Sequence, residues 1–427
     1  MNLVYFHTHD MGRYIQPYGY GISTPHMQKL AEEGCTFRNA FSIAPTCSPS
    51  RAALLTGQYP HQCGMFGLTN EGWRLNDYDK HLVSWLKKNG FETALAGSHH
   101  EDDPAPSHIP YDYIFNSNCI ENRFVTTGYA VEYIRRAHNK PFFLSVGYDN
   151  NHNHRIRETV AKCGAFLGEP DSRYVRGLPH VPDLPGTRGY FSELSKAVQY
   201  EDIQLGRIRQ ALRDSRLDSE TIILFTTDHG PSLPYAKRTL TDAGTGVALI
   251  LWAPGRIPCG RVIEPAVTHL DVYPSLCDLL RLDKPDWLEG RSLLPLINGE
   301  TECLHDAIYL QQTYHGEYMP LRAVRTGRYK YVRRYGDIDA SRHFLSDDNY
   351  GIGLIETCGY DQWPFEREQL YDLYYDTCER MNLISHPNYV DTARLLRQML
   401  TAWQTEKQDP ILHGDIPPCS VMNKKDI

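Results

Sequence analysis

The chain has 427 residues, of which 41% are hydrophobic and 22% are charged, a composition that favours a folded globular protein over a disordered one. Its 44 lysines and arginines against 52 aspartates and glutamates give a formal net charge of −8, which disfavours a general nucleic-acid or anionic-membrane binder. No apolar run is long enough to span a bilayer, and a chain of this length favours one large domain with a smaller one.

Two features of the sequence bear on the cellular compartment. Residues 1–7 carry no basic segment followed by a long apolar stretch, so the sequence predicts a cytoplasmic protein, or a periplasmic or secreted one if a signal was trimmed. The 11 cysteines include no CxxC pair, which disfavours a zinc ribbon or a thioredoxin-type centre. Most of these cysteines are therefore expected to be reduced and buried.

Strand-like and helix-like segments alternate through residues 1–300, which are predicted to form an α/β catalytic domain. The predicted strands are 3–6, 93–96, 142–146, 222–225 and 247–252. The predicted helices include 25–33, 82–88 and 194–212. This alternation indicates a mostly parallel central sheet that is covered by helices on both faces.

Residues 301–427 are predicted to form a smaller antiparallel α+β subdomain. A tight turn at 326–328 separates two short strands, and a helix around 393–403 closes the subdomain. The predicted strands are 307–310, 321–325, 329–332 and 370–373.

Histidine and aspartate follow four of the predicted strands, at the edge of an α/β sheet where ligands bind. These segments are His9–Asp10, Ser98–His100, Asn150–His152 and Asp228–His229. A single histidine of this kind is usually a structural loop residue, but four such segments at one edge predict a functional site. The acidic run 101–103, by contrast, is predicted to be a solvated turn.

The most informative stretch reads CSPSRAALLTG, from Cys47 to Gly57. Pro49 and the helix-forming residues after it predict a helix that begins near Cys47 and ends at Gly57. Cys47 then lies at a helix N-terminus, where the N–H groups and the helix dipole favour anionic chemistry. Arg51, one turn later, adds a fixed cation.

This stretch resembles the signature of the formylglycine-dependent sulfatases, a family within the alkaline phosphatase superfamily, at every fixed position. The resemblance extends over nearly the whole chain, and residues 61–68 are most similar to the heparan N-sulfatase (sulfamidase) branch. It implies an alkaline-phosphatase-like sulfatase fold. It also implies that a formylglycine-generating or anaerobic sulfatase-maturating enzyme oxidises Cys47 to Cα-formylglycine. The implied substrate is a sulfated carbohydrate, with N-sulfoglucosamine of heparan- or heparin-type glycans as the leading candidate.

The resemblance also implies one divalent cation, with Ca²⁺ preferred and Mg²⁺ as the alternative. Its expected ligands are His9, Asp10, Asp228, His229 and the modified side chain of Cys47.

Four further residues receive catalytic roles from the resemblance. Arg51 and Lys237 would neutralise the sulfate oxygens. His100 would act as the base when sulfate is expelled from the modified Cys47, and His152 or Lys237 would protonate the leaving group.

The sequence departs from the family pattern at two positions. His9 stands where the family usually carries the first of two adjacent aspartates, and it is expected either to bind the metal or to hydrogen-bond a substrate oxygen. Ser98 stands where a lysine is expected. Either His99 or an adjacent cation compensates for that lysine, or turnover is slow.

Two other functions stay open from the sequence. One is a phosphoester or phosphonate hydrolase of the same superfamily, although such enzymes usually carry Ser or Thr as the nucleophile. The other is a degenerate, sulfatase-like protein that binds glycans without cleaving them.

Overall fold

The computed structural model describes residues 1–102, 108–115, 124–336, 353, 356–359 and 366–419. Its centre is an eight-stranded sheet in the order β10-β2-β9-β7-β1-β6-β4-β5. In that order the strands are Arg261–Ile263, Cys35–Phe37, Leu249–Trp252, Thr221–Thr227, Asn2–Thr8, Phe142–Tyr148, Glu92–Gly97 and Tyr113–Phe115. Strands β7, β1 and β6 are buried along their whole length, as expected for the middle of a sheet that is covered on both faces.

The central strands β7, β1, β6, β4 and β5 run parallel, which confirms the predicted fold class. The prediction of one continuous strand at 247–252 is wrong. Its first part, β8 (Gly246–Val247), belongs to a separate three-stranded sheet, and β9 runs antiparallel to β7. Between them, Ala248 donates its N–H to the carbonyl of Gly12 at 2.9 Å, and the chain passes there from one sheet to the other. The other strands of the small sheet are β3 (Ala40–Phe41) and β11 (Val267–Thr268).

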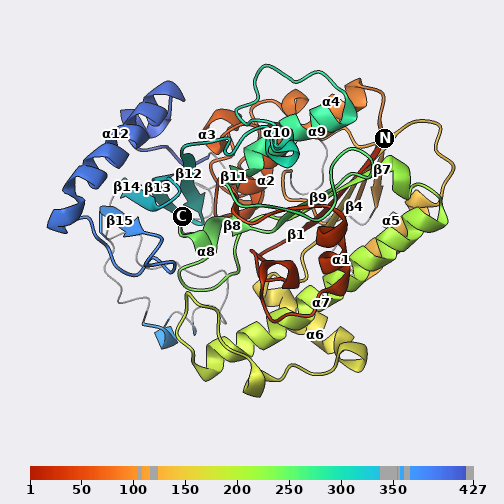
Figure 1. Ribbon diagram of the computed structural model, residues 1–427, viewed down its shortest axis with the longest axis horizontal. Coiled ribbons are helices and arrows are strands. Elements are labelled where there is room, and N and C mark those ends of the chain that lie inside the picture. The colour runs from red at the N-terminus through yellow and green to blue at the C-terminus, as the bar shows by residue number, and fades with distance from the viewer. Residues whose placement is uncertain (103–107, 116–123, 337–352, 354–355, 360–365, 420–427) are drawn as a thin grey trace.

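Helices cover both faces of the main sheet (Figure 1), and successive residues of β1 face the two layers in turn. Val4 and Phe6 pack in an apolar cluster with α1, α5, α6 and α7, whereas Leu3 and Tyr5 pack with α2, α4, α9 and α10. None of the described helices combines the length and the apolar character that a membrane span needs. The helices are α1 (Pro25–Glu33), α2 (Cys47–Thr56), α3 (Pro60–Cys63), α4 (Leu82–Lys88), α5 (Thr126–Ile134), α6 (Asn153–Leu167), α7 (Pro185–Asp214), α8 (Asp242–Thr245), α9 (Val272–Leu280) and α10 (Leu294–Asn298).

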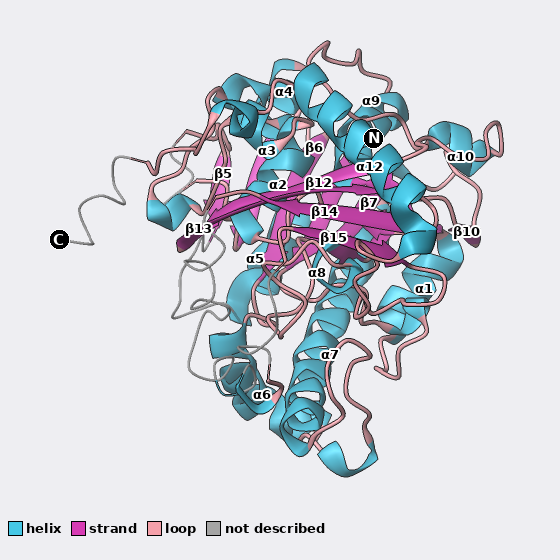
Figure 2. Cartoon of the chain, turned by 90° about the vertical axis from the view of Figure 1, so that its left-hand side faces the viewer, coloured by secondary structure: helices cyan, strands magenta, loops and turns pink. Residues whose placement is uncertain are grey.

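A four-stranded antiparallel sheet, β12-β13-β14-β15, and helix α12 (Val390–Glu406) make up the C-terminal part (Figure 2). Trp403 of α12 and Tyr331 of β14 share one apolar cluster with Ala53 of α2, so this part packs directly on the helix that carries Cys47. Its strands are Ile308–His315, Glu317–Arg325, Tyr329–Arg334 and Glu368–Asp372.

Candidate active site

The segments that carry the predicted site residues lie side by side, because β7, β1, β6 and β4 are parallel neighbours in the sheet. His9 and Asp10 follow β1, and Asp228 and His229 follow β7. Helix α2 reaches the same edge, where Ser50 Oγ donates to the carbonyl of Asp228 at 2.5 Å.

Helix α2 begins at Cys47 and ends before Gly57, as the sequence predicts. Thr46 is extended, at φ −144° and ψ 148°, and Gly57 adopts a left-handed φ of 69°, which glycine takes readily. The whole helix is buried, and Cys47 Sγ lies 3.2 Å from His229 Nε2. Burial raises the pKa of the Cys47 thiol well above its usual value, so the unmodified sulfur is a protonated thiol and a poor nucleophile.

Arg51 is fixed by three contacts inside the protein. Its guanidinium lies 3.1 Å from Asp228 Oδ2, 3.0 Å from the carbonyl oxygen of Thr8 and 2.6 Å from His7 Nδ1. Burial alone would raise the pKa of Asp228, but His229 and Arg51 hold that pKa well below its ordinary value. Asp228 is therefore ionised, and its neighbouring cation, Arg51, is held in place by its three contacts.

The predicted metal-binding residues meet in one group. Ligand atoms of His9, Asp10, Cys47 and Asp228 all lie within 4.8 Å of one another. The fifth residue, His229, places its Nε2 3.5 Å from Asp10 Oδ1 and 3.7 Å from Asp228 Oδ2. Carboxylate oxygens at this spacing suit one hard divalent cation, and an imidazole nitrogen can complete its shell.

His9 offers a direct test of whether the group fits a metal. Its Nδ1 lies 3.2 Å from Asp228 Oδ2, is buried and makes no hydrogen bond among the described residues. Burial lowers the pKa of His9 to about 4, so the ring is neutral at pH 7. A neutral ring nitrogen without a hydrogen bond, next to two carboxylates, is what a metal ligand requires.

Lys237 and His152 lie next to each other, as expected if both face the leaving group. Lys237 Nζ is 3.0 Å from Asp10 Oδ2 and 3.5 Å from His152 Nε2. The ammonium group therefore lies between the metal-binding group and the histidine that follows β6.

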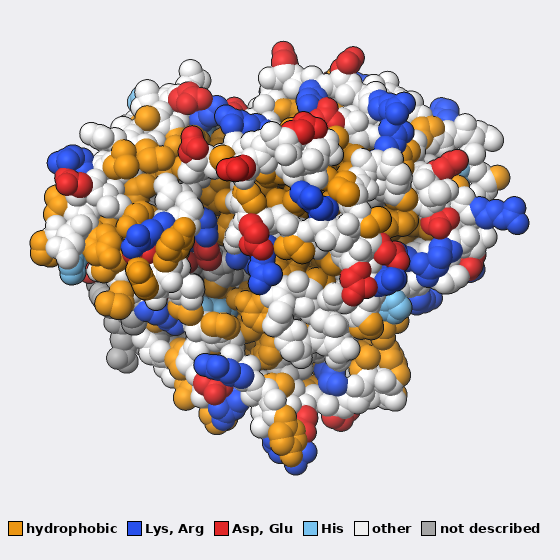
Figure 3. Space-filling view, in the orientation of Figure 1, with side chains coloured by type: hydrophobic (Ala, Val, Ile, Leu, Met, Phe, Trp, Pro, Cys, Tyr) orange, Lys and Arg blue, Asp and Glu red, His pale blue; other side chains and the backbone are white. Residues whose placement is uncertain are grey.

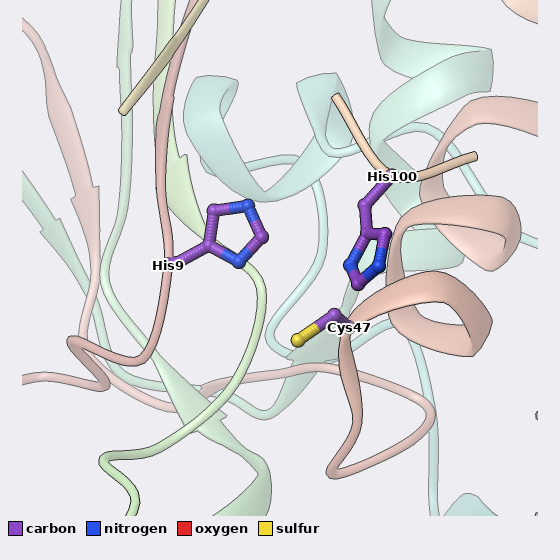
Figure 4. Close-up of side chains that lie close together, drawn as sticks. All are labelled: His9, Cys47 and His100. Carbon is purple, nitrogen blue, oxygen red and sulfur yellow. The ribbon is translucent and has the colours of Figure 1, made fainter. Parts of the chain in front are cut away.

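His100 approaches Cys47 from the segment that follows β4. Nitrogen atoms of His9 and His100 and the sulfur of Cys47 lie within 4.8 Å of one another, and Figure 4 shows the three side chains around a common space. The backbone of His100 has a positive φ of 144°, a strained conformation of the kind found at functional sites. Burial lowers the pKa of His100 to about 3, so its ring is neutral at pH 7.

Sequence reasoning missed His7 and misplaced Glu101. His7 lies inside β1 and is held between Arg51 and Ser145 Oγ, the latter at 3.1 Å from its Nε2. The prediction of a solvated turn at 101–103 is wrong for Glu101 and Asp102, which are 2% and 0% exposed, and Asp103 lies outside the described residues.

The burial of Glu101 bears on the expected role of His99. His99 Nδ1 lies 3.6 Å from Glu101 Oε2. Burial alone would raise the pKa of Glu101, but His99 and the charge of Arg51 hold that pKa below its ordinary value. His99 therefore pairs with an ionised carboxylate.

The fixed charges of the described site nearly balance before any metal ion is counted. Arg51 and Lys237 carry two positive charges, Asp10 and Asp228 carry two negative ones that offset them, and the buried Glu101 nearby adds a third negative charge. A divalent cation in this group makes the site net positive, which favours an anionic substrate such as a sulfate ester.

Comparisons with known proteins agree with this geometry. Residues 1–282 match the family model described as Sulfatase, and residues 230–349 match the model described as N-sulphoglucosamine sulphohydrolase, C-terminal. N-sulphoglucosamine sulphohydrolase of Homo sapiens is 28% identical over 444 residues, covering 91% of this chain and 86% of that protein. An ulvan-active sulfatase of Formosa agariphila is 27% identical, covering 96% of this chain and 80% of the relative.

Solved structures show the same fold. A structure bound to its substrate D-glucosamine-2-N,6-O-disulfate superposes with a TM-score of 0.75 at 17% identity, over 96% of this chain and 98% of that one. A structure described as a 2-O GAG sulfatase gives a TM-score of 0.74 at 22% identity, over 96% and 93% of the two chains.

Proposed function

Because the chain belongs to the sulfatase family, whose members are sulfuric ester or sulfamate hydrolases, we propose that it desulfates a sulfated sugar through a formylglycine made from Cys47. The leading substrate is N-sulfoglucosamine at the end of a heparan- or heparin-type chain. The observation that carries this proposal is the position of Cys47, at the start of α2 and within 4.8 Å of ligand atoms of His9, Asp10 and Asp228.

The substrate assignment has support from two kinds of relative. The N-sulphoglucosamine sulphohydrolase model matches the C-terminal part, and the human enzyme of that name matches 91% of the chain. A solved structure of the same fold holds D-glucosamine-2-N,6-O-disulfate as its substrate, which supports a sulfated glucosamine.

The residues of the chain divide the work of hydrolysis. The hydrated aldehyde made from Cys47 supplies the nucleophilic hydroxyl, and a divalent cation, Ca²⁺ by preference, would be held by His9, Asp10, Asp228 and His229 and would polarise the sulfate oxygens. Arg51 keeps Asp228 ionised through their contact at 3.1 Å and adds positive charge beside the nucleophile.

Three side chains remain for binding and proton transfer. Lys237 binds a sulfate oxygen, and its neighbour His152, 3.5 Å away, gives a proton to the departing oxygen or nitrogen. His100, neutral at pH 7, takes the proton from the Cys47-derived group when sulfate leaves.

The burial of Cys47 supports its modification before α2 folds, because the side chain is only 1% exposed in the folded protein. The partner we propose is a formylglycine-generating or anaerobic sulfatase-maturating enzyme that acts on the unfolded segment.

The test is release of inorganic sulfate by protein that has been co-produced with a formylglycine-generating enzyme. N-sulfoglucosamine, O-sulfated sugars and nitrophenyl sulfate are compared with the phosphate and phosphonate analogues, with added Ca²⁺ or Mg²⁺. We expect sulfate release that Cys47→Ala abolishes and that Cys277→Ala, a change at another buried cysteine in α9, leaves intact. Preferential cleavage of phosphate compounds would overturn the proposal, as would binding of sulfated sugars without any release.

A further inference from the structure

We propose that Ser98 is a positioning residue that sets the tautomer of His9, so that the two residues together replace the aspartate and lysine of the family pattern. This inference rests on the proposed function, because it takes His9 Nδ1 to be a ligand of the divalent cation. Beyond the proposed function, it gives Ser98 a role and treats the departures at His9 and Ser98 as one coupled change.

Strand β6 brings His9 and Ser98 together although they follow different strands. Gly147 of β6 pairs with His7 of β1 on one side and with Gly97 of β4 on the other. A Cβ atom at position 147 would lie 1.8 Å from the carbonyl oxygen of Ser98 and 2.5 Å from His7 Cε1. Only glycine therefore lets the chain that leaves β4 come this close to β1.

Two backbone hydrogen bonds hold the pair in register with β6. Ser98 donates its N–H to the carbonyl of Gly147 at 3.0 Å, and His9 donates its N–H to the carbonyl of Tyr148, also at 3.0 Å. The two side chains then meet above the strand, with Ser98 Oγ 3.4 Å from His9 Nε2.

A serine hydroxyl can either donate or accept, and its role as acceptor here would place the proton of His9 on Nε2. When Nε2–H donates to Ser98 Oγ, the lone pair lies on Nδ1, the nitrogen that is 3.2 Å from Asp228 Oδ2 and close to the metal-binding group. The opposite tautomer would point an N–H at Asp228 and remove the ligand. Asp228 already accepts hydrogen bonds from Arg51 and from the backbone N–H groups of Asp10 and His229. Partners of this kind, which orient a histidine ligand, commonly change metal affinity by about 10- to 100-fold when they are removed.

The charges of the two departures also balance. An aspartate at position 9 and a lysine at position 98 would together add no net charge, and a neutral imidazole with a hydroxyl adds none either. Either change alone would shift the net charge of the site by one. The two departures together leave the net charge of the site unchanged. The site therefore needs no lysine at position 98, even though His99 is paired with Glu101.

The test is a double-mutant cycle read by Ca²⁺ affinity, measured calorimetrically on the chelator-treated full chain with Ca²⁺ as the only added ligand. The variants are Ser98→Ala, Ser98→Thr, Ser98→Lys, His9→Asp and His9→Asp/Ser98→Lys. The matched control is Ser195→Ala, a half-buried serine of α7 that donates to the carbonyl of Phe191. Melting temperatures in chelator confirm that each variant is folded.

We expect Ser98→Ala to weaken Ca²⁺ binding about 10-fold, and Ser98→Thr, which keeps the hydroxyl, to retain most of the affinity. Ser98→Lys should weaken binding strongly beside His9 and much less in the His9→Asp background. Equal effects of Ser98→Lys in both backgrounds, or no effect of Ser98→Ala, would overturn this inference alone. A parent protein that does not bind Ca²⁺ at all would overturn the Ca²⁺ assignment, and this inference with it.

Discussion

At the scale of single residues, Arg51 links helix α2, which carries Cys47, to the candidate metal ligand Asp228. It is 1% exposed, and its planar guanidinium reaches the Asp228 carboxylate, the Thr8 carbonyl and the His7 ring at the same time. A lysine in its place would keep the charge but could not reach three acceptors in these directions. The geometry of Arg51 therefore matters as much as its charge.

Replacing Arg51 with lysine should lower both stability and turnover. We expect the free energy of unfolding to fall by about 1–3 kcal/mol, because a buried polar partner is left unsatisfied, and kcat to fall on the order of 100-fold. Urea unfolding and sulfate release measure the two effects. The control is Arg322→Lys, since Arg322 is equally buried but pairs with Asp409 in the C-terminal part. That variant should lose stability and keep its kcat, and equal losses of kcat in both variants would contradict a specific role for Arg51.

At the scale of elements, the site depends on the way β6 spaces its two neighbours. Strands β1 and β4 both pair with β6, and their following segments carry His9 and His100. Gly147 allows β1 and the segment after β4 to lie close together. A Cβ atom at position 147 would collide with the backbone carbonyl of Ser98, which cannot rotate away as a side chain can.

The variant Gly147→Ala should therefore damage the site through the backbone. We expect the free energy of unfolding to fall by about 1–3 kcal/mol from overpacking, together with weaker Ca²⁺ binding. Gly128→Ala in α5 is the control, because nothing lies within 4 Å of its added Cβ, and it should raise stability by about 0.5–1 kcal/mol. Unchanged Ca²⁺ affinity in Gly147→Ala would show that the spacing of β1 and β4 is not critical.

The elements also show what a sequence can and cannot predict. Helix α2 and the central parallel strands follow from local patterns: a proline in the first turn, a terminal glycine, and apolar runs followed by His or Asp. The split between β8 and β9 depends on a hydrogen bond from Ala248 to Gly12, more than 200 residues away, which no local pattern encodes. The lowered pKa of the buried Glu101 likewise depends on the charge of Arg51, which lies on α2 and reaches Glu101 only in the folded protein.

At the scale of the whole molecule, one carboxylate ties the catalytic part to the C-terminal sheet. Asp242 of α8 accepts a two-pronged contact from Arg325 of β13, at 2.9–3.3 Å, and lies 2.6 Å from Lys330 Nζ of β14. On the face shown in Figure 3, positive and negative side chains are interspersed. That face therefore presents no broad basic surface.

Replacing Asp242 with asparagine should lower the free energy of unfolding by an amount that depends on pH. Burial alone would raise the pKa of Asp242, but Lys330 and Arg325 lower that pKa well below its ordinary value of 3.8. Its stabilising contribution is therefore fully present above pH 3.8 and is lost as the pH falls toward the folded-state pKa. At pH 7 we expect Asp242→Asn to lose about 3–5 kcal/mol of unfolding free energy, because the buried Arg325 loses its carboxylate partner while Lys330 keeps Glu379 at 2.8 Å.

Urea unfolding as a function of pH measures this prediction. The difference between parent and variant should shrink in acid. The control is Asp278→Asn, which breaks a half-exposed pair with Lys284 and should cost less than about 1 kcal/mol. A pH-independent difference for Asp242→Asn would show that the carboxylate charge is not what ties the two parts.

The most direct test of the central claim is the mass of the proteolytic peptide that contains Cys47, after co-production with a formylglycine-generating enzyme and beside a sulfatase known to be processed in the same cells. We predict that the CH₂SH group of Cys47 is replaced by CHO, and that the extent of this conversion tracks the rate of sulfate release across preparations. An unmodified thiol beside a fully converted control, in protein that still releases sulfate, would contradict the account.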